Sequence, residues 1–183
     1  MQRINFNRNF LGFNTNEDIF LDTCIVLALL NKYDSWYPTV QNLFSTHVIQ
    51  STNEPTFYIH PGIITEVTKI ADKPLDKYMK AFNFGLSKDD IDEAIDMTLS
   101  GITELIEYEI INLLDINSTI MKRQVKYSRY FDATDSLTVS LLEEYGIGLL
   151  TVDSALIRNI EQKATDFPNI GNLYYTTSSH RAY

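Results

Sequence analysis

Residues 18–30 read Asp18-Ile19-Phe20-Leu21-Asp22-Thr23-Cys24-Ile25-Val26-Leu27-Ala28-Leu29-Leu30. The apolar run that ends at Asp22 is typical of a buried strand, and the apolar stretch up to Leu30 predicts a helix directly after it. Short apolar runs alternate with longer amphipathic ones along the chain, which is the pattern of parallel strands joined by crossover helices. We therefore expect an α/β fold of three layers, α/β/α, with a mostly parallel sheet of about five strands.

The other elements are predicted from the same pattern, and no linker or repeat divides the chain, so residues 1–183 are expected to form one domain. The segment 74–101 is expected to be a helical insertion. Residues 1–16 are expected to be an added edge strand or a mobile arm, and residues 178–183 a mobile tail. Strands are predicted at 56–60, 147–152 and 172–176, helices at 37–48, 61–71, 118–127, 132–145 and 154–164, and either a strand or a continued helix at 108–114.

Composition limits the class of protein. Hydrophobic residues make up 44% and charged residues 21% of the chain, which is typical of a folded domain. The single cysteine, Cys24, excludes an intramolecular disulfide and zinc sites built on paired cysteines. No signal-peptide core is found in residues 1–16, and no apolar run approaches the ~20 residues of a membrane span, so we expect a cytoplasmic protein without a membrane partner. The net charge of −9 disfavours general attraction to nucleic acid, so a polyanion has to be bound by a local site.

Carboxylates follow the predicted strands at one end. Asp22 and Asp153 directly follow two of them, and Glu66 falls in the first turns of the helix after another. Asp132 and Asp135 lie three residues apart at the start of the helix that precedes the strand at 147–152. Ligands of open parallel sheets bind outside the carboxyl ends of the strands, so we expect these five acids to meet at one edge.

Such a cluster without interleaved basic residues would repel itself unless some acids were protonated or a cation neutralised them. Oxygen-only ligation favours Mg²⁺ or Mn²⁺, and such ions activate water for phosphodiester hydrolysis without a covalent intermediate. Each acid also has a simpler explanation. Asp22, Asp132, Asp135 and Asp153 stand where Asp caps a helix or complements its dipole, and Glu66 alone is most simply a solvated helix residue.

Four segments that carry these acids together resemble the motifs of the PIN-domain nucleases. Residues 20–30 resemble the first motif, a buried strand that ends in Asp-Thr before an apolar helix, and Ile63-Ile64-Thr65-Glu66-Val67 resembles the second, a helix start that carries Glu. Asp135-Ser136-Leu137-Thr138-Val139-Ser140-Leu141 is similar to the third, and Leu149-Leu150-Thr151-Val152-Asp153 to the fourth. They occur in the family's order and cover residues 18 to 160.

This resemblance implies a metal-dependent endoribonuclease that prefers single-stranded RNA, often the toxin of a VapC-type toxin–antitoxin pair. It implies that Asp22, Glu66, Asp135 and Asp153 are the catalytic acids and bind the Mg²⁺ or Mn²⁺, with Asp132 as a fifth ligand or the alternative to Asp135. RNA and an antitoxin protein are the implied partners, and a homodimer is left open. Two features depart from the family pattern. Cys24 stands where many members have Asn, and the segment 74–101 is longer than a compact toxin needs.

Four basic residues precede the Asp132 turn, with no acid among them: Lys122, Arg123, Lys126 and Arg129. They are predicted to bind the RNA backbone, with Tyr127 or Tyr130 available to stack on a base. A solvated basic helix face explains the same residues equally well. Two other functions remain open at this point: a catalytically inactive PIN-like scaffold that binds a protein or RNA partner, and a small-molecule phosphatase or nucleotidase.

Overall fold

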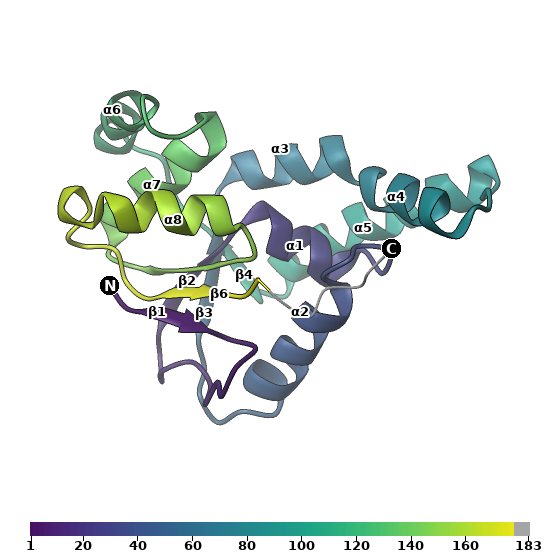
Figure 1. Ribbon diagram of the computed structural model, residues 1–183, viewed down its shortest axis with the longest axis horizontal. Coiled ribbons are helices and arrows are strands. Elements are labelled where there is room, and N and C mark those ends of the chain that lie inside the picture. Colours follow the sequence, from purple (N-terminus) through teal and green to yellow (C-terminus); the bar gives the residue numbers. More distant parts are fainter. Residues whose placement is uncertain (178–183) are drawn as a thin grey trace.

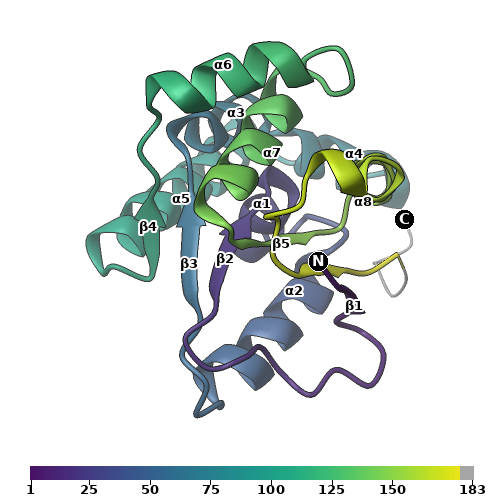
Figure 2. The same cartoon turned by 90° about the vertical axis from the view of Figure 1, so that its left-hand side faces the viewer.

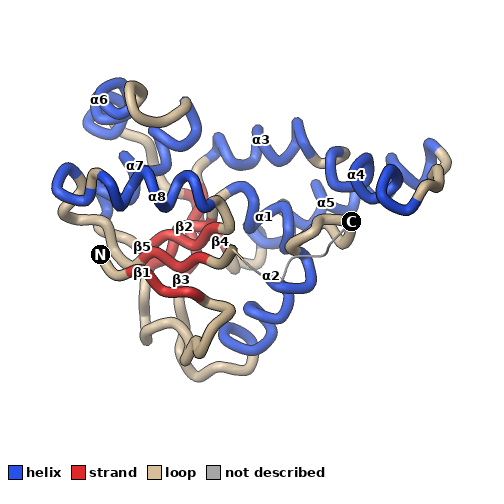
Figure 3. The backbone as a smooth tube through the Cα atoms, viewed as in Figure 1, coloured by secondary structure: helices blue, strands red, loops and turns tan. Residues whose placement is uncertain are grey.

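A computed structural model describes residues 1–177, in which a six-stranded sheet is flanked by helices (Figure 3). The order of the strands is β1-β6-β5-β2-β3-β4, and every pairing is parallel. Figure 2 shows β4, β3, β2 and β5 in this order. The expected α/β class is confirmed, with six strands in place of about five. The strands are β1 (Arg3–Asn5), β2 (Asp18–Leu21), β3 (Thr56–Ile59), β4 (Ile111–Leu113), β5 (Gly148–Thr151) and β6 (Leu173–Tyr175).

The helices follow the sequence pattern closely. Figure 1 places α6 and α4 at opposite ends of the molecule, with α3 and α1 between them. No helix among residues 1–177 combines the length and apolar character needed to cross a membrane. The α-helices are α1 (Thr23–Leu30), α2 (Tyr37–Phe44), α3 (Pro61–Ile70), α4 (Lys73–Phe82), α5 (Lys88–Glu107), α6 (Ser118–Tyr127), α7 (Ala133–Tyr145) and α8 (Ser154–Gln162), with a π-helical turn at Ser45–Ile49 and a 3-10 turn at Ala164–Asp166.

The core centres on β2 and its neighbour β5. Ile19, Phe20 and Leu21 are fully buried, as are Leu149 and Leu150. Strands of a parallel sheet that are covered on both faces have continuous apolar sequences, which explains why both runs lack polar alternation. Leu21 lies opposite Leu150 in the register, so β2 and β5 end side by side.

The start of the chain is packed against the sheet. β1 pairs with β6, and Arg3 lies opposite Leu173. Phe13 is buried, and its ring lies 5.0 Å from that of Tyr174. Of the two alternatives for residues 1–16, the added edge strand is therefore the one observed, at Arg3–Asn5. The predicted mobile tail, residues 178–183, lies outside the described residues.

Two element boundaries differ from the sequence pattern. The segment 108–114 combines both alternatives, because α5 continues to Glu107 and a strand begins at Ile111 after Glu109 takes a positive φ of 56°. The predicted helix at 37–48 is regular only to Phe44 and then widens into the π-helical turn. Neither difference concerns the residues at the carboxyl ends of β2 and β5.

Candidate acidic site at the carboxyl edge of the sheet

The ends of β2 and β5 open into a pocket of about 530 Å³, called here the acid pocket. Besides Asp34 in the loop before α2, four segments of the chain contribute carboxylates to it. Asp22 and Asp153 directly follow the two neighbouring strands, and Glu66 comes from α3. Asp132 and Asp135 come from the start of α7. The structure thus brings all five acids expected from the sequence into the lining of one pocket, while the roles given to them stay predictions.

Asp22 is the acid most tightly held by the protein. Its Oδ1 accepts a hydrogen bond from the backbone N–H of Thr23 at 2.8 Å. Its Oδ2 accepts one from the Thr151 hydroxyl at 2.5 Å and one from the Cys24 thiol at 3.1 Å. Burial raises the pKa of Asp22, while these hydrogen bonds act in the opposite direction. Asp22 therefore has a fixed orientation, and the thiol of Cys24 is one of the groups that hold it.

Glu66 is connected to the end of β2 by one side chain. The Thr23 hydroxyl donates to Glu66 Oε2 at 2.8 Å. The position of α3 itself depends on His60, whose Nδ1 accepts from the backbone N–H of Gly62 at 2.9 Å. Burial lowers the pKa of His60 to about 4, so its ring is neutral at physiological pH and can accept this bond. The cap of α3 thus sets the direction from which Glu66 enters the pocket.

The simpler explanation of the aspartates holds as well, because three of them cap helices and Asp135 lies in the first turn of α7, where it complements the helix dipole. Asp22, Asp132 and Asp153 are the N-cap residues of α1, α7 and α8. Asp132 Oδ1 accepts from the backbone N–H of Asp135 at 2.9 Å, and Asp153 Oδ1 accepts from two backbone N–H groups of α8. Asp132 and Asp153 each use only Oδ1 for the cap. Within residues 1–177 their Oδ2 atoms accept no hydrogen bond. Capping therefore leaves both residues an oxygen for a ligand.

Asp135 carries the electrostatic signature of the cluster. Burial raises its pKa to about 7, together with the negative charges of Asp132, Asp22, Asp153 and Glu66. A like charge disfavours ionisation of a carboxyl only when it lies nearby, so the five groups interact. The acid pocket therefore holds more negative charge than its surroundings neutralise.

The donor set suits a hard divalent cation, although the side chains are not gathered around one. Within residues 1–177, no three His, Cys, Asp or Glu side chains form a group arranged to hold a metal ion. All five candidate ligands offer carboxylate oxygens, which Mg²⁺ and Mn²⁺ prefer. These carboxylates repel one another, and a bound cation would remove that repulsion. The chemistry of the residues thus fits such an ion.

None of the four basic residues predicted to bind RNA lines the acid pocket. Arg123 forms an ion pair of 2.7 Å with Glu144, and the Arg129 guanidinium lies 4.6 Å from the centre of the Tyr130 ring. Lys122 and Lys126 are exposed on α6, and Lys126 lies over the Tyr127 ring. Gln124 Nε2 donates to Ala133 O at 3.0 Å, so the C-terminal part of α6 touches the start of α7 beside Asp132.

Sequence reasoning did not identify several residues of the acid pocket. Thr151 stands in the quoted Thr-x-Asp motif, but the pattern gives no partner for its hydroxyl. Trp36 was expected to be core or interface material, and it packs against the core as well as lining the pocket. Lys77 belongs to the predicted insertion, to which the sequence assigns no role. The only sequence signal for Trp36 and Lys77 was the type of side chain, one aromatic and one basic.

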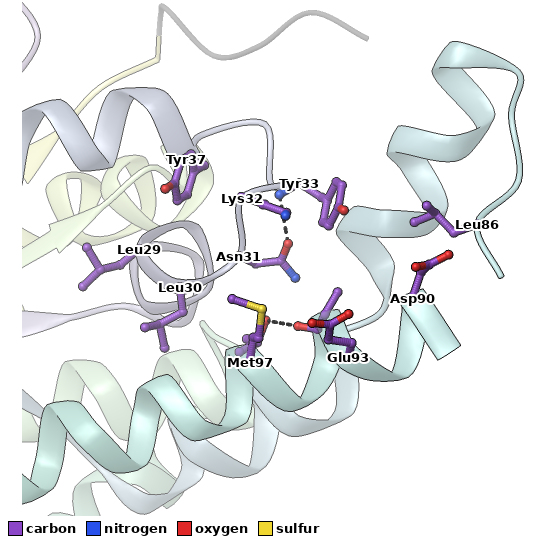
Figure 4. Close-up of a pocket in the computed structure, with 12 residues that line it drawn as sticks. Leu29, Leu30, Asn31, Lys32, Tyr33, Tyr37, Leu86, Asp90, Glu93 and Met97 are labelled. Atoms are coloured by element: carbon purple, nitrogen blue, oxygen red, sulfur yellow. Dashed lines mark hydrogen bonds between the residues drawn. The ribbon is translucent and has the colours of Figure 1, made fainter. Parts of the chain in front are cut away.

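A second cavity, of about 360 Å³, lies between the end of α1, the start of α2 and α5 (Figure 4). Its walls include Leu30 and Met97, and Asp90 and Glu93 come from a single helix. Asp90 is occupied by the cap of α5, where Ser87 donates to it at 2.6 Å. None of the five carboxylates of the acid pocket reaches this cavity, so the candidate site is placed in the acid pocket.

Comparison with known proteins adds little to this geometry. No protein-family model matches the chain, and no curated protein matches it. Among solved structures, it is similar to a chain of the crystal structure of VapBC2 from Rickettsia felis bound to a DNA fragment from their promoter. The sequence identity is 15% and the TM-score 0.45, over 86% of this chain and 98% of that chain. This similarity is too weak to assign a family or an activity.

Proposed function

We propose that this chain is a PIN-like ribonuclease that hydrolyses phosphodiester bonds of RNA with Mg²⁺ or Mn²⁺ held in the acid pocket. The observation that carries the proposal is the convergence of five carboxylates from four segments on one pocket at the carboxyl edge of the sheet. Capping explains three of them, but it explains neither Asp135 nor Glu66. A divalent cation accounts for the whole set.

In this proposal Asp22, Glu66, Asp135 and Asp153 hold the cation, with Asp132 as a fifth ligand or in place of Asp135. When bound, the cation supplies a Lewis acid that lowers the pKa of water and neutralises charge at phosphorus. The protein supplies orientation. Three donors fix Asp22, from Thr23, Cys24 and Thr151, and the Thr23 hydroxyl holds Glu66.

A covalent intermediate on the protein is not part of this mechanism. The one thiol of the pocket, Cys24, donates its hydrogen to Asp22. Burial and the charge of Asp22 raise the pKa of the Cys24 thiol well above its usual range, which suppresses the thiolate form that attacks electrophiles. Direct attack by water at phosphorus is therefore the favoured route.

Cleavage of RNA by the purified full chain tests the proposal. Single-stranded RNA is incubated with Mg²⁺ or Mn²⁺ and the wild type, Asp22→Asn or Asp153→Asn. Asn caps helices as well as Asp does, so both variants should stay folded while each loses a charge. We expect the wild type to cleave, EDTA or either substitution to abolish cleavage, and Asp92→Asn, a change on the exposed face of α5, to cleave normally.

The other outcomes distinguish the rival functions. Cleavage that survives both substitutions would mean that the activity comes from another source. Absence of cleavage with every divalent ion would support an inactive scaffold. Hydrolysis of nucleotides or phosphate monoesters without cleavage of RNA would support a phosphatase or nucleotidase.

Ion binding can be measured without activity, because Trp36 is the only tryptophan of the chain and lines the acid pocket. Terbium(III) is a hard, oxygen-ligated ion whose luminescence is sensitised by a nearby indole. We expect sensitised emission with the wild type, its displacement by Mn²⁺, and its loss in the Asp22→Asn, Asp153→Asn double variant. Equal emission from both proteins would contradict ion binding at this site.

The proposal extends to the toxin role and antitoxin partner that the sequence resemblance implies. A toxin of this kind should arrest the growth of a bacterial host on induction, through the same acids that cleave RNA. Growth arrest by the wild type and normal growth with Asp22→Asn at equal protein levels are the expected results. Normal growth with both proteins would leave a ribonuclease that is not a toxin.

A further inference from the structure

The acid pocket is lined by apolar, aromatic and basic side chains as well as by carboxylates. Leu27, Trp36, Ile70 and Lys77 contribute to this lining. Of the described residues that line the pocket, six are acidic, including Asp34, and Lys77 is the only basic one. Among residues 1–177, Lys77 forms no salt bridge, so its ammonium group is not already neutralised by a carboxylate.

The position of Lys77 follows from the path of α3 into α4. Glu66 and Ile70 lie four residues apart on α3 and both face the acid pocket. The chain then enters α4, which is anchored by the buried side chains of Pro74 and Leu75. Lys77 follows within the first turns of that helix, on the exposed side. The predicted insertion thus returns a positive charge to the pocket.

Trp36 and Lys77 belong to segments that are packed together. The ring of Tyr33, in the loop before Trp36, lies 5.2 Å from the ring of Tyr78, the neighbour of Lys77 on α4. The loop is ordered locally, since the backbone N–H of Trp36 donates to Asp34 Oδ1 at 2.8 Å. Trp36 and Lys77, which both line the pocket, therefore belong to two segments that pack against each other.

These two side chains have the chemistry that a single-stranded nucleotide needs. A base stacks on an aromatic ring whatever its identity, and a lysine pairs with phosphate as a compact point charge. In a pocket lined by six acids, a polyanion is repelled everywhere except beside a cation.

We propose that Trp36 and Lys77 form a nucleotide subsite, in which one base of a single-stranded RNA stacks on Trp36 and its phosphate pairs with Lys77. This inference rests on the proposed ribonuclease function. It assigns a substrate-positioning role to α4 and makes Lys77 a positioning residue for the phosphodiester that lies over the carboxylates. The basic residues of α6 are then a second contact, on a helix at the opposite end of the molecule from α4 (Figure 1).

Kinetics and binding test the subsite with matched lysine variants. Lys80 lies on the same helix as Lys77 and is exposed, but it does not line the acid pocket. We expect Lys77→Ala to raise KM about tenfold with kcat within about twofold, Lys77→Arg to recover most of the loss, and Lys80→Ala to behave like the wild type. A loss of kcat alone in Lys77→Ala would contradict a positioning role.

Binding is measured in the Asp22→Asn background, where no cleavage is expected. RNA should quench the fluorescence of Trp36, and adding Lys77→Ala should weaken binding about tenfold. It should also reduce the slope of log K against log salt by about 0.7, the value for one phosphate contact on a single strand. For Trp36→Phe, binding is followed by the anisotropy of labelled RNA, and we expect a weakening of about threefold because a smaller ring still stacks.

The outcomes separate this inference from the ribonuclease proposal. If the wild type cleaves RNA and both Lys77→Ala and Lys77→Glu match Lys80→Ala in KM and salt dependence, the subsite is refuted and the ribonuclease stands. If the wild type cleaves nothing but RNA quenches Trp36 in a Lys77-dependent way, the hydrolysis is refuted and the subsite stands.

Discussion

Replacing Asp135 by Asn should stabilise the protein at alkaline pH and not at acid pH. Asp135 is half-buried and accepts no hydrogen bond from a described residue, and its pKa is raised from 3.8 to about 7. Between these two values the folded protein binds a proton that the unfolded chain has released. The free energy of unfolding therefore falls as pH rises through this window, and the full penalty is present above about pH 7.

The size of the effect follows from the same two values. A rise from 3.8 to about 7 corresponds to an upper limit of about 4 kcal/mol, at 1.36 kcal/mol per pH unit. Water and salt screen a side chain that is only partly buried, so we expect about 1–2 kcal/mol. Asn occupies the same volume without the charge. The difference between Asp135→Asn and the wild type should therefore grow from near zero at pH 4 to about 1–2 kcal/mol at pH 8.

Urea denaturation with EDTA at pH 4, 6 and 8 measures this difference. Asp132→Asn should give a smaller gain, because it removes only one of the charges that act on Asp135 and keeps the cap of α7. Asp92→Asn, outside the cluster, should give no pH-dependent gain. Replacing EDTA by Mn²⁺ at pH 8 should stabilise the wild type more than Asp135→Asn. A difference that does not vary with pH, or an Asp135→Asn protein that is less stable at pH 8, would show that the five carboxylates do not repel one another.

Three further predictions concern the groups that support the acids. Because burial lowers the pKa of His60 to about 4, the unfolded chain gains a proton before the folded one, and this group should lower stability by up to about 3 kcal/mol as pH drops from 6.5 to 4; His60→Asn should lack this contribution, so its stability relative to the wild type should rise over the window, whereas a constant difference would contradict it. Cys24 should react with a disulfide reagent at pH 8 at least about tenfold more slowly in the folded protein than in urea, since the pKa of its thiol is raised; equal rates would contradict this. Thr151→Val removes the fully buried hydroxyl that donates to Asp22. We expect it to lower the free energy of unfolding in urea by about 1–3 kcal/mol and to lower the rate of RNA cleavage. If neither value changed, Thr151 would have no role in orienting Asp22.

Local sequence predicted the elements of this fold well, because each carries its own signal. The apolar run before Asp22 and the one before Asp153 both became fully buried strands. β1 gave no comparable signal, because Arg3-Ile4-Asn5 is too short for any periodicity and is a strand only through its pairing with β6. The junction at Glu107–Ile111 was ambiguous because a helix and a strand share one apolar stretch there.

The candidate site was predictable to the extent that it depends on topology alone. Strands of a parallel sheet end at one edge, so acids after β2 and β5 were expected there, and the pairing of β2 with β5 makes them neighbours. The place of Lys77 in the lining depends on tertiary packing. The contact of Tyr33 with Tyr78 joins residues 45 positions apart, and no local pattern encodes it.

The capping and the metal-binding explanations of the acids have one structural cause. In a parallel α/β sheet the helices α1, α7 and α8 begin at the carboxyl edge or next to it, and each places the positive end of its dipole there. Asp22, Asp132 and Asp153 cap these helices, so part of their charge is neutralised by backbone N–H groups. Asp135 caps nothing, and burial together with the charges of the other four acids raises its pKa to about 7. The negative charge available to a cation is therefore the part that the helix caps do not neutralise. Substitutions of Asp135 and of the capping aspartates should for this reason affect stability and ion binding differently.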